Sequence, residues 1–277
     1  MEKEKKGEIR LSPSSVIMME TCAKQYQYRH LLGIRPKVKD RKMLLGDIRH
    51  RAIERIVRTD LPTTVDEPFL TETERDRLNQ EVDAFYHWWM DTGFVPLYFD
   101  DGLPAIELKL EVVHPEDPEI TLLTRLDIMV VDNQDRVCLL DWKSGATKTS
   151  QVFVNHSDQL TIGQICAEPY LRSLGVDKLD RLSIVDIHGP TQKKGASIDG
   201  PIWAPRRGAV QIADMLEKLR IIKERILRGE FFRTSRYGFN SPCATCEYEP
   251  LCRSTDNLGE YTVKEPGVLI PAGLEDL

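Results

Sequence analysis

The sequence lacks the features of a membrane protein, a secreted protein or a repeat protein. Its 277 residues contain no run of about 18 apolar residues, so we expect no membrane span. The first ten residues mix lysine with glutamate and have no apolar core. This argues against a secretory signal and favours the cytoplasm, or the host cytoplasm if the protein is viral. Internal repeats and low-complexity tracts are absent too. With 41% hydrophobic and 30% charged residues, the composition is that of a soluble globular protein.

An excess of positive charge, the usual mark of a nucleic-acid-binding domain, is also missing, because the formal net charge is −6. The charge is nevertheless unevenly distributed. Residues 24–58 contain eleven lysines and arginines against three acids, and residues 203–236 contain nine against four. Two such stretches could line one anion-binding face. Two solvated helix surfaces are the simpler interpretation, and the charges alone favour it.

Three helices are predicted in the first hundred residues. Ser12 is a good cap for the first helix, and Gly33 is a typical stop at its end. The spacing of apolar residues predicts the other two at residues 46–58 and 71–91. We therefore expect residues 60–104 to form a helical insertion before the first strand.

The hydrophobic period changes to two after this insertion, as expected for strands. The sequence predicts a three-stranded meander, a helix that Pro169 disturbs, a further strand and a last amphipathic helix. This order favours an α/β fold with a mixed central sheet flanked by helices. Beyond residue 253 we expect an irregular tail on the surface. The predicted strands are residues 106–113, 120–131, 136–142 and 181–187, and the helices are residues 158–174 and 209–227.

The most informative stretch is Asp141-Trp142-Lys143, at the end of an apolar strand. Residues two apart on a strand point the same way, so Asp141 and Lys143 share a face. An acid that holds a divalent metal suits phosphodiester hydrolysis when an ammonium group beside it positions water and screens the developing charge. Taken alone, the pattern more commonly means a salt bridge at a strand end.

A second acid is needed, and Asp127 lies in the preceding strand. If the loop between the strands has three residues, Asp132 faces Arg136 and Asp127 faces Asp141. A loop of two residues would put the two acids on opposite faces of the sheet. The hypothesis of a shared site therefore predicts an odd loop or a bulge.

Four further positions are candidates for the same site. His50 lies at the edge of the apolar stripe of its helix and could join carboxylates around a manganese-like metal, although a lone helical histidine is more commonly a surface or core residue. Glu107 and Glu111 are weaker candidates, and solvated strand positions are their simpler interpretation. Gln159 begins the helix after the catalytic strand, where its amide could reach the substrate or Lys143.

The six cysteines fall into two groups. Two of them, Cys138 and Cys166, have apolar neighbours and are expected in the core. Four thiolates suit a structural zinc ion or a 4Fe–4S cluster, and their spacing does not choose between the two. Disulfides are not expected in the cytoplasm. The four candidates are Cys22 and the three cysteines of a C-x2-C-x5-C motif, Cys243, Cys246 and Cys252.

Taken in order, these motifs resemble the RecB-like branch of the PD-(D/E)XK nucleases. More narrowly, the chain is similar to the iron–sulfur exonucleases that include the CRISPR-associated Cas-four proteins and the AddB nuclease domain. The resemblance covers nearly the whole chain, residues 9–252. The matching features are Ser12-x-Ser14 leading to Cys22, Gly46-x3-His50, Asp127, Asp141-x-Lys143, Gln159 and the C-terminal cysteine motif.

The resemblance implies a restriction-endonuclease-like core and two metal centres. His50, Asp127, Asp141 and the carbonyl of Trp142 would bind Mn²⁺ or Mg²⁺, with Lys143 as the catalytic lysine. Cys22, Cys243, Cys246 and Cys252 would hold a 4Fe–4S cluster that joins the N- and C-terminal segments. The sequence departs from the family at one point, because a tyrosine is common four or five residues after the glutamine and Gly163 and Gln164 stand there.

The same resemblance implies one nuclease domain over residues 1–277. Its N-terminal helices, with the first cluster cysteine and His50, would occupy residues 9–58, and the helical insertion residues 60–104. The catalytic core would follow at residues 105–190, then the last helix and cluster loop at residues 208–252, and the tail at residues 253–277.

Three functions are compatible with these patterns. The first is a metal-dependent DNA exonuclease or end-processing nuclease for single strands or free ends, in recombination, repair or CRISPR adaptation, with Tyr26, Tyr28 and Trp203 as candidates for base stacking. The second is a nuclease-fold subunit that binds DNA mainly within a recombination or CRISPR-adaptation complex, which the acidic charge would fit. The third is a zinc-stapled DNA-binding module of another fold. Rings and dimers occur among the resembling proteins, so a homo-oligomer is also compatible.

Overall fold

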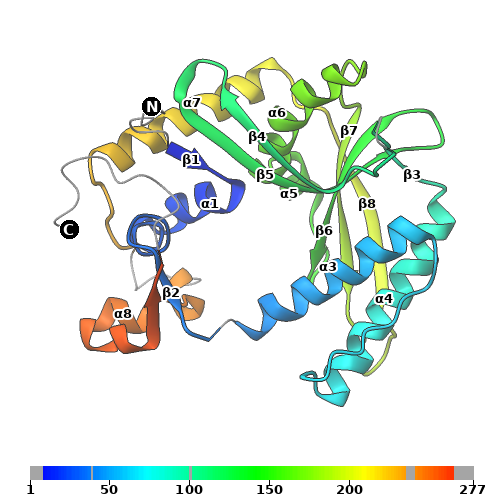
Figure 1. Cartoon of the computed structure of the whole chain (residues 1–277), viewed down its shortest axis with the longest axis horizontal. Helices are drawn as coiled ribbons and strands as arrows, with labels where there is room; N and C mark the ends of the chain where they lie inside the picture. Colours follow the sequence, from blue (N-terminus) through cyan, green and yellow to red (C-terminus); the bar gives the residue numbers. More distant parts are fainter. Residues whose placement is uncertain (1–8, 39, 100–101, 235–240, 265–277) are drawn as a thin grey trace. The chain divides into compact units, whose positions relative to one another are not determined.

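The computed structural model describes residues 9–38, 40–99, 102–234 and 241–264 (Figure 1). These residues form two compact units. The first unit is Met1–Lys39, Glu111–Leu123 and Ala209–Leu277, and the second is Asp40–Leu110 and Thr124–Gly208. Strands β4 (Ile106–His114) and β5 (Asp117–Val131) contribute residues to both. No helix among the described residues has the length and apolarity needed to cross a membrane.

The second unit contains a mixed sheet, as predicted. Strand β6 (Val137–Ser144) pairs antiparallel with β5 and parallel with β7 (Arg181–His188). Strand β7 pairs antiparallel with β8 (Ser197–Pro205), and the short β3 (Val95–Pro96) pairs with β5. Strand β8 was not predicted, because Gly200 and Pro201 in its middle are typical of a turn. Strand β8 tolerates this glycine and proline because it pairs with a neighbouring strand on only one side.

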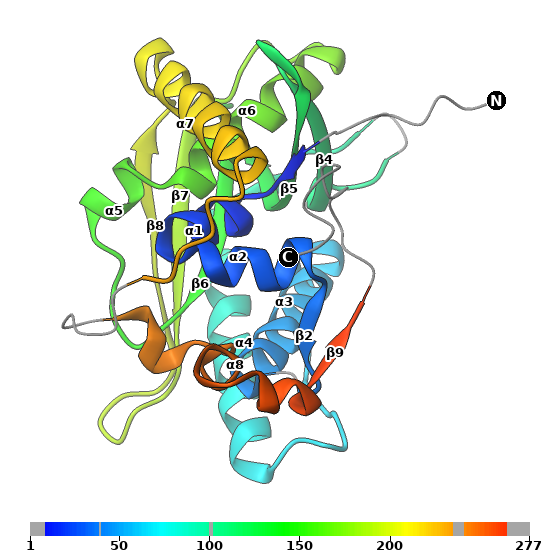
Figure 2. The same cartoon turned by 90° about the vertical axis from the view of Figure 1, so that its left-hand side faces the viewer.

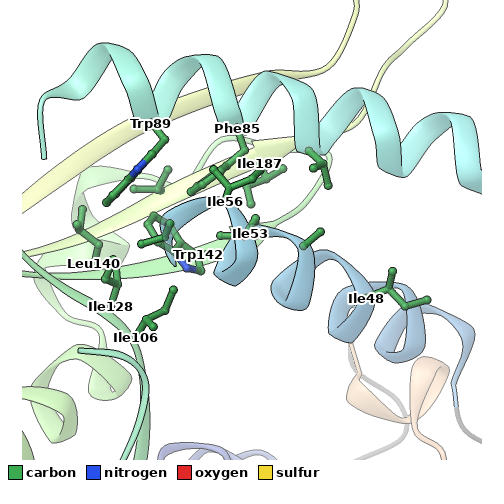
Figure 3. Packing of buried hydrophobic residues seen from close by; sticks show 14 of the residues in the cluster. Ile48, Ile53, Ile56, Phe85, Trp89, Ile106, Ile128, Leu140, Trp142 and Ile187 are labelled. Carbon is green, nitrogen blue, oxygen red and sulfur yellow. The ribbon is translucent and has the colours of Figure 1, made fainter. Parts of the chain in front are cut away.

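Helices cover both faces of this sheet. The helices α3 (Arg41–Thr59) and α4 (Glu72–Thr92) pack their apolar sides on one face. Phe85 of α4 meets Trp142 of β6 edge to face, with ring centroids 5.1 Å apart. Figure 3 shows Ile53, Ile56, Phe85 and Trp89 around Leu140, Trp142 and Ile187.

The opposite face of the sheet receives α6 (Asp158–Ser173). A Cβ atom at Gly163 would lie 3.0 Å from the side chain of Leu139, the neighbour of Leu140 that points the other way. Pro169 lies inside α6, which continues past it to Ser173, so the expected disturbance ends no helix. A short helix, α5 (Gln151–Asn155), precedes α6.

The predicted helix α4 belongs to the expected insertion at residues 60–104, yet it supplies part of the core of the second unit. Its residues Leu78, Val82 and Phe85 are almost completely buried. The helix begins where expected, after Thr71, whose side chain accepts a hydrogen bond from the backbone N–H of Glu74. Removal of this segment would therefore expose the face of the sheet that carries Trp142.

In the first unit, the single helix predicted from Ser12 to Gly33 is wrong. The segment forms α1 (Pro13–Thr21), α2 (Ala23–Tyr26) and a π-helical turn, η1 (Gln27–Leu31). The helix breaks at Cys22, whose backbone is extended at φ −160° and ψ 102°. No proline or glycine marks this break. The cap at Ser12 and the stop at Gly33, where φ is +62°, are as predicted.

The rest of the first unit contains one long helix and a small C-terminal assembly. Helix α7 (Ala209–Leu227) has the predicted bounds, and β1 (Ile9–Leu11) runs parallel to residues Ile120–Leu122 of β5. Short helices η2 (Pro242–Thr245), α8 (Glu249–Arg253) and η3 (Thr255–Glu260) lead to β9 (Tyr261–Val263).

The irregular tail predicted after residue 253 is wrong for residues 255–263. Strand β9 pairs antiparallel with β2 (Ile34–Pro36), as Figure 2 shows. Tyr261 is buried, stacks on Tyr248 and donates a hydrogen bond to the carbonyl of Glu247. A buried aromatic ring thus orders the segment. The remainder of the predicted tail, residues 265–277, lies outside the described residues.

A buried ion pair links α3 to α4 in the second unit. The Arg49 guanidinium lies 2.6 Å from Glu81, and both side chains are at most 8% exposed. Arg77 donates a further hydrogen bond to Glu81 at 2.9 Å. A Cβ atom at Gly189 would come within 2.5 Å of the Glu81 carboxylate, so a side chain there would force this ion pair to shift.

Replacing Glu81 by Leu should lower the free energy of unfolding by about 3–5 kcal/mol, because Arg49 would be left buried without a countercharge. The double variant with Arg49→Met should recover part of this loss, since no lone charge remains. Chemical denaturation measures both. Arg58→Met on the same helix is the control, because its ion pair with Glu54 is partly exposed and should contribute about 0.5 kcal/mol or less. Equal losses for Glu81→Leu and Arg58→Met would contradict this account.

Candidate metal centre

Five elements of the second unit bring six functional candidates together. Helix α3 supplies His50, β4 supplies Glu107, and β5 supplies Asp127. Strand β6 supplies Asp141 and Lys143, and the first turn of α6 supplies Gln159.

The hairpin between β5 and β6 has the predicted three-residue loop. Its register runs from Val131 opposite Val137 to Ile128 opposite Leu140, which puts Asp127 and Asp141 one position beyond the last paired residues, on the same face. At the other end, the backbone N–H of Asp132 donates to the carbonyl of Arg136. The two acids therefore meet across the strands.

Hydrogen bonds hold these acids in place. Asp127 accepts one from the backbone N–H of Trp142 at 2.6 Å. Asp141 accepts one from Gln159 at 2.5 Å, and its other oxygen lies 2.7 Å from the Lys143 ammonium. Lys143 also donates to the Gln159 side-chain oxygen at 2.7 Å. Asp141, Lys143 and Gln159 thus form a closed triangle of contacts.

A second group of possible ligands lies beside this triangle. The Nδ1 atom of His50 is 3.3 Å from Glu107 and 3.9 Å from Asp127. One ligand atom from each of His50, Glu107 and Asp127 can be chosen so that all lie within 4.8 Å of one another. Imidazole and carboxylate donors at this spacing suit Mn²⁺ or Mg²⁺.

Glu107 was the weaker candidate in the sequence, and the structure places it in the ligand group. Its backbone has φ +51°, a left-handed conformation that interrupts the alternation of β4. The alternation of apolar and polar residues in the sequence does not reveal this change in backbone conformation. Glu111 lies elsewhere, in the first unit, where it forms an exposed ion pair with Arg10.

The electrostatics favour a cation at this position. Burial and the nearby Asp141 raise the pKa of Asp127 to about 7. Burial also raises the pKa of Asp141, although Lys143 and Gln159 oppose the shift. For His50, burial alone would lower the pKa, but the hydrogen bond to Glu107 and the surrounding carboxylates raise it. Buried negative charge is thus incompletely compensated, and a divalent cation fits the donors present.

The metal-ligand group opens into a cleft of about 730 Å³. His50, Glu107 and Asp127 line it, together with Arg51 of α3 and Arg125 of β5. The carbonyl of Trp142 stays a predicted ligand, while its indole ring is buried in the core.

The four candidate cluster cysteines, all in the first unit, line one small cavity. They are free, half-buried thiols, whereas Cys138 and Cys166 are fully buried and burial raises the pKa of each to about 12. Among the described residues, no three cysteine sulfurs lie within 4.8 Å of one another.

Two of the three candidates for base stacking are core residues. Tyr26 is buried and stacks on His30, and Tyr28 is buried against Tyr248. Neither ring is accessible for base stacking, which agrees with the expectation that at least one of these aromatic residues packs in the core. Trp203 is partly buried and lies under the guanidinium of Arg181.

The position where a tyrosine is common holds the buried Gln164. Its side chain accepts a hydrogen bond from the backbone N–H of Arg207 and donates one to the Arg207 carbonyl. Arg207 is itself 1% exposed and donates to the carbonyl of Val154. This arginine of the second basic stretch is structural. Arg236, at the end of the stretch, lies outside the described residues.

Comparison with known proteins identifies the family. The family model described as the PD-(D/E)XK nuclease superfamily matches residues 10–253. Similar solved structures include SSO0001 (TM-score 0.45, 12% identity, 89% of this chain and 87% of that chain). They also include an alkaline exonuclease, LHK-Exo, from Laribacter hongkongensis (TM-score 0.31, 13% identity, 80% and 93%). No curated protein matches the chain. Because the family model spans almost the full length, the protein belongs to the PD-(D/E)XK nuclease superfamily.

Proposed function

We propose that the protein is a metal-dependent DNA nuclease that hydrolyses phosphodiester bonds as an exonuclease or end-processing enzyme, on single strands or free ends. One observation carries the proposal. In a chain of this nuclease superfamily, the hairpin register sets Asp127 opposite Asp141, next to His50 and Lys143. The family match excludes the third hypothesis, a module of another fold.

His50, Asp127, Asp141 and the Trp142 carbonyl, with Glu107 as a further donor, would hold Mn²⁺ or Mg²⁺. When bound, the ion supplies charge that polarises the scissile phosphate and lowers the pKa of water. Lys143 is held by Asp141 and Gln159, so its ammonium group stays at the strand end, where it can orient the attacking water and stabilise developing negative charge. Gln159 donates to Asp141 and accepts from Lys143, and so fixes both.

Asp141→Asn and Lys143→Ala should each lower the rate of Mn²⁺-dependent DNA hydrolysis about a hundredfold or more, because one removes a ligand charge and the other a charge-stabilising donor. Release of nucleotides from an end-labelled linear single strand measures the rate. Lys148→Ala is the control, since this exposed lysine pairs with Asp199, which is not a site residue. Full activity in both site variants would disprove the site. Equal digestion of closed circular strands would disprove the exonuclease assignment alone.

Asp127→Asn should raise the melting temperature of metal-free protein and abolish the stabilisation by Mn²⁺. The raised pKa of Asp127 means that its ionised form is disfavoured in the fold, and the amide removes that charge along with the ligand. In the wild type, saturation at about 100 times Kd should add about 2.7 kcal/mol. His87→Ala, on the exposed side of α4, should respond to Mn²⁺ as the wild type does. An unchanged Mn²⁺ response in Asp127→Asn would remove this residue from the metal centre.

We also propose that Cys22, Cys243, Cys246 and Cys252 hold a 4Fe–4S cluster that joins the N- and C-terminal segments. The small cavity that all four thiols line supports it. Burial raises the pKa of Cys246, and the other three cysteines raise it further, because the four thiols lie close enough to interact. A cluster there would link the chain ahead of α2 to the segment around α8.

Protein purified without oxygen should be brown and contain about four irons per chain. Cys246→Ala should lose both the colour and the iron. Cys166→Ala, which removes a buried thiol of the second unit, should keep them. Visible spectra and metal analysis decide the outcome, and about one zinc per chain in fresh protein would contradict the iron–sulfur proposal.

A second candidate function is a DNA-binding subunit that acts mainly within a recombination or CRISPR-adaptation complex. The net charge of −6 favours a protein partner. Several arginines of the basic stretches already form ion pairs within the protein, such as Arg49 with Glu81 and Arg206 with Glu168. Activity that is weak alone and rises when a partner is added would favour it.

We further propose that both units form one nuclease domain, since the family model spans segments of each.

A further inference from the structure

Arg125 is a charged residue that lines the cleft and is not one of the proposed metal ligands. It lies on β5, two residues before Asp127, so both side chains leave the same face of the strand. Its side chain is 58% exposed and lines the cleft with His50 and Asp127. Its Nε atom lies 3.2 Å from Glu107. An accessible guanidinium is thus held beside the metal-ligand group.

Glu107 connects Arg125 to this group through its two oxygens. Its Oε1 atom lies 3.3 Å from His50, and its Oε2 atom lies 3.2 Å from Arg125. One carboxylate can therefore serve the metal and orient the arginine at the same time. The left-handed backbone of Glu107 costs about 1–3 kcal/mol in a non-glycine residue. Retention of such strain at this point is consistent with a functional placement of the carboxylate.

The other arginine of the cleft is differently placed. Arg51 pairs with Glu67, and both also line a separate, neighbouring cleft. Arg125 is the arginine whose partner belongs to the metal-ligand group. A guanidinium has five N–H donors in a planar fork that matches two phosphate oxygens, and the contact with Glu107 leaves most of them available.

We infer that Arg125 binds a backbone phosphate of the nucleic-acid substrate in the cleft, next to the phosphate that is hydrolysed, and that Glu107 positions it. The inference rests on the proposed nuclease function and names one contact of its substrate. The ligand is the phosphodiester itself, so the contact is independent of base sequence.

The test is binding of a fluorescent single-stranded oligothymidylate in Ca²⁺, with the DNA checked for integrity. Arg125→Gln should weaken binding about tenfold, as expected for a lost charge-assisted hydrogen bond. The slope of log K against log salt should fall by about 0.7, the value for one phosphate contact on a single strand. Arg125→Lys should keep the slope, because the positive charge remains. It should lose part of the affinity, because lysine lacks the planar set of N–H donors of the guanidinium. Neither variant should lose Mn²⁺ binding, because all the metal ligands are retained.

Arg172→Gln on α6 is the matched control, since its side chain is 57% exposed and it also pairs with a glutamate. It should bind DNA with the wild-type affinity and slope. A neutral methylphosphonate, moved along the oligonucleotide one position at a time, locates the contact. At one position it should weaken wild-type binding and leave Arg125→Gln unaffected.

The outcomes separate the inference from the function on which it rests. Wild-type affinity and slope in Arg125→Gln, with active wild-type enzyme, would overturn the phosphate contact alone. Methylphosphonate effects that are the same in wild type and Arg125→Gln at every position would do so as well. A wild-type protein that neither binds nor cleaves DNA would overturn both.

Discussion

The register of the β5–β6 hairpin is the constraint on which the metal centre depends. Three loop residues place Asp132 opposite Arg136 and, further along, Asp127 opposite Asp141. Asp132 stabilises the turn, because its carboxylate accepts hydrogen bonds from the backbone N–H groups of Gln134 and Arg136 and pairs with the Arg136 guanidinium. A slip of one residue would turn Asp127 away from its partner. The packing of Ile128 and Leu140 against α3 and α4 penalises the same slip, so the core and the site specify one register.

The core also determines how the site residues are presented. Trp142 is buried among the aromatic side chains of α4, and its two neighbours on β6 therefore point away from that core. Those neighbours are Asp141 and Lys143. The indole anchors a strand whose alternate residues carry the chemistry, and α6 adds Gln159 from the opposite face. Two buried carboxylates with raised pKa values are thus kept together by packing around them, at some cost to the stability of the metal-free fold.

Much of this could be predicted from the sequence because local rules decide it. The bounds of α7 follow from an amphipathic period, the start of α1 from Ser12, and the meeting of Asp127 with Asp141 from loop length. Other features arise from tertiary contacts that no local pattern encodes. The break at Cys22 carries no helix-breaking residue, and the burial of Tyr261 orders a segment of otherwise polar sequence. The place of Glu107 depends on one left-handed backbone angle.

The contact of Gly189 with the buried ion pair has a consequence for the evolution of this sequence. Four positions, 49, 77, 81 and 189, share one small volume, in which the carboxylate of Glu81 occupies the space of a missing side chain. A side chain at position 189 would require the carboxylate of Glu81 and the guanidinium of Arg77 to shift, because even a methyl group would collide with both. Substitutions at these positions are therefore expected to appear together in related sequences, as correlated changes between the helices α3 and α4 and the chain that follows β7.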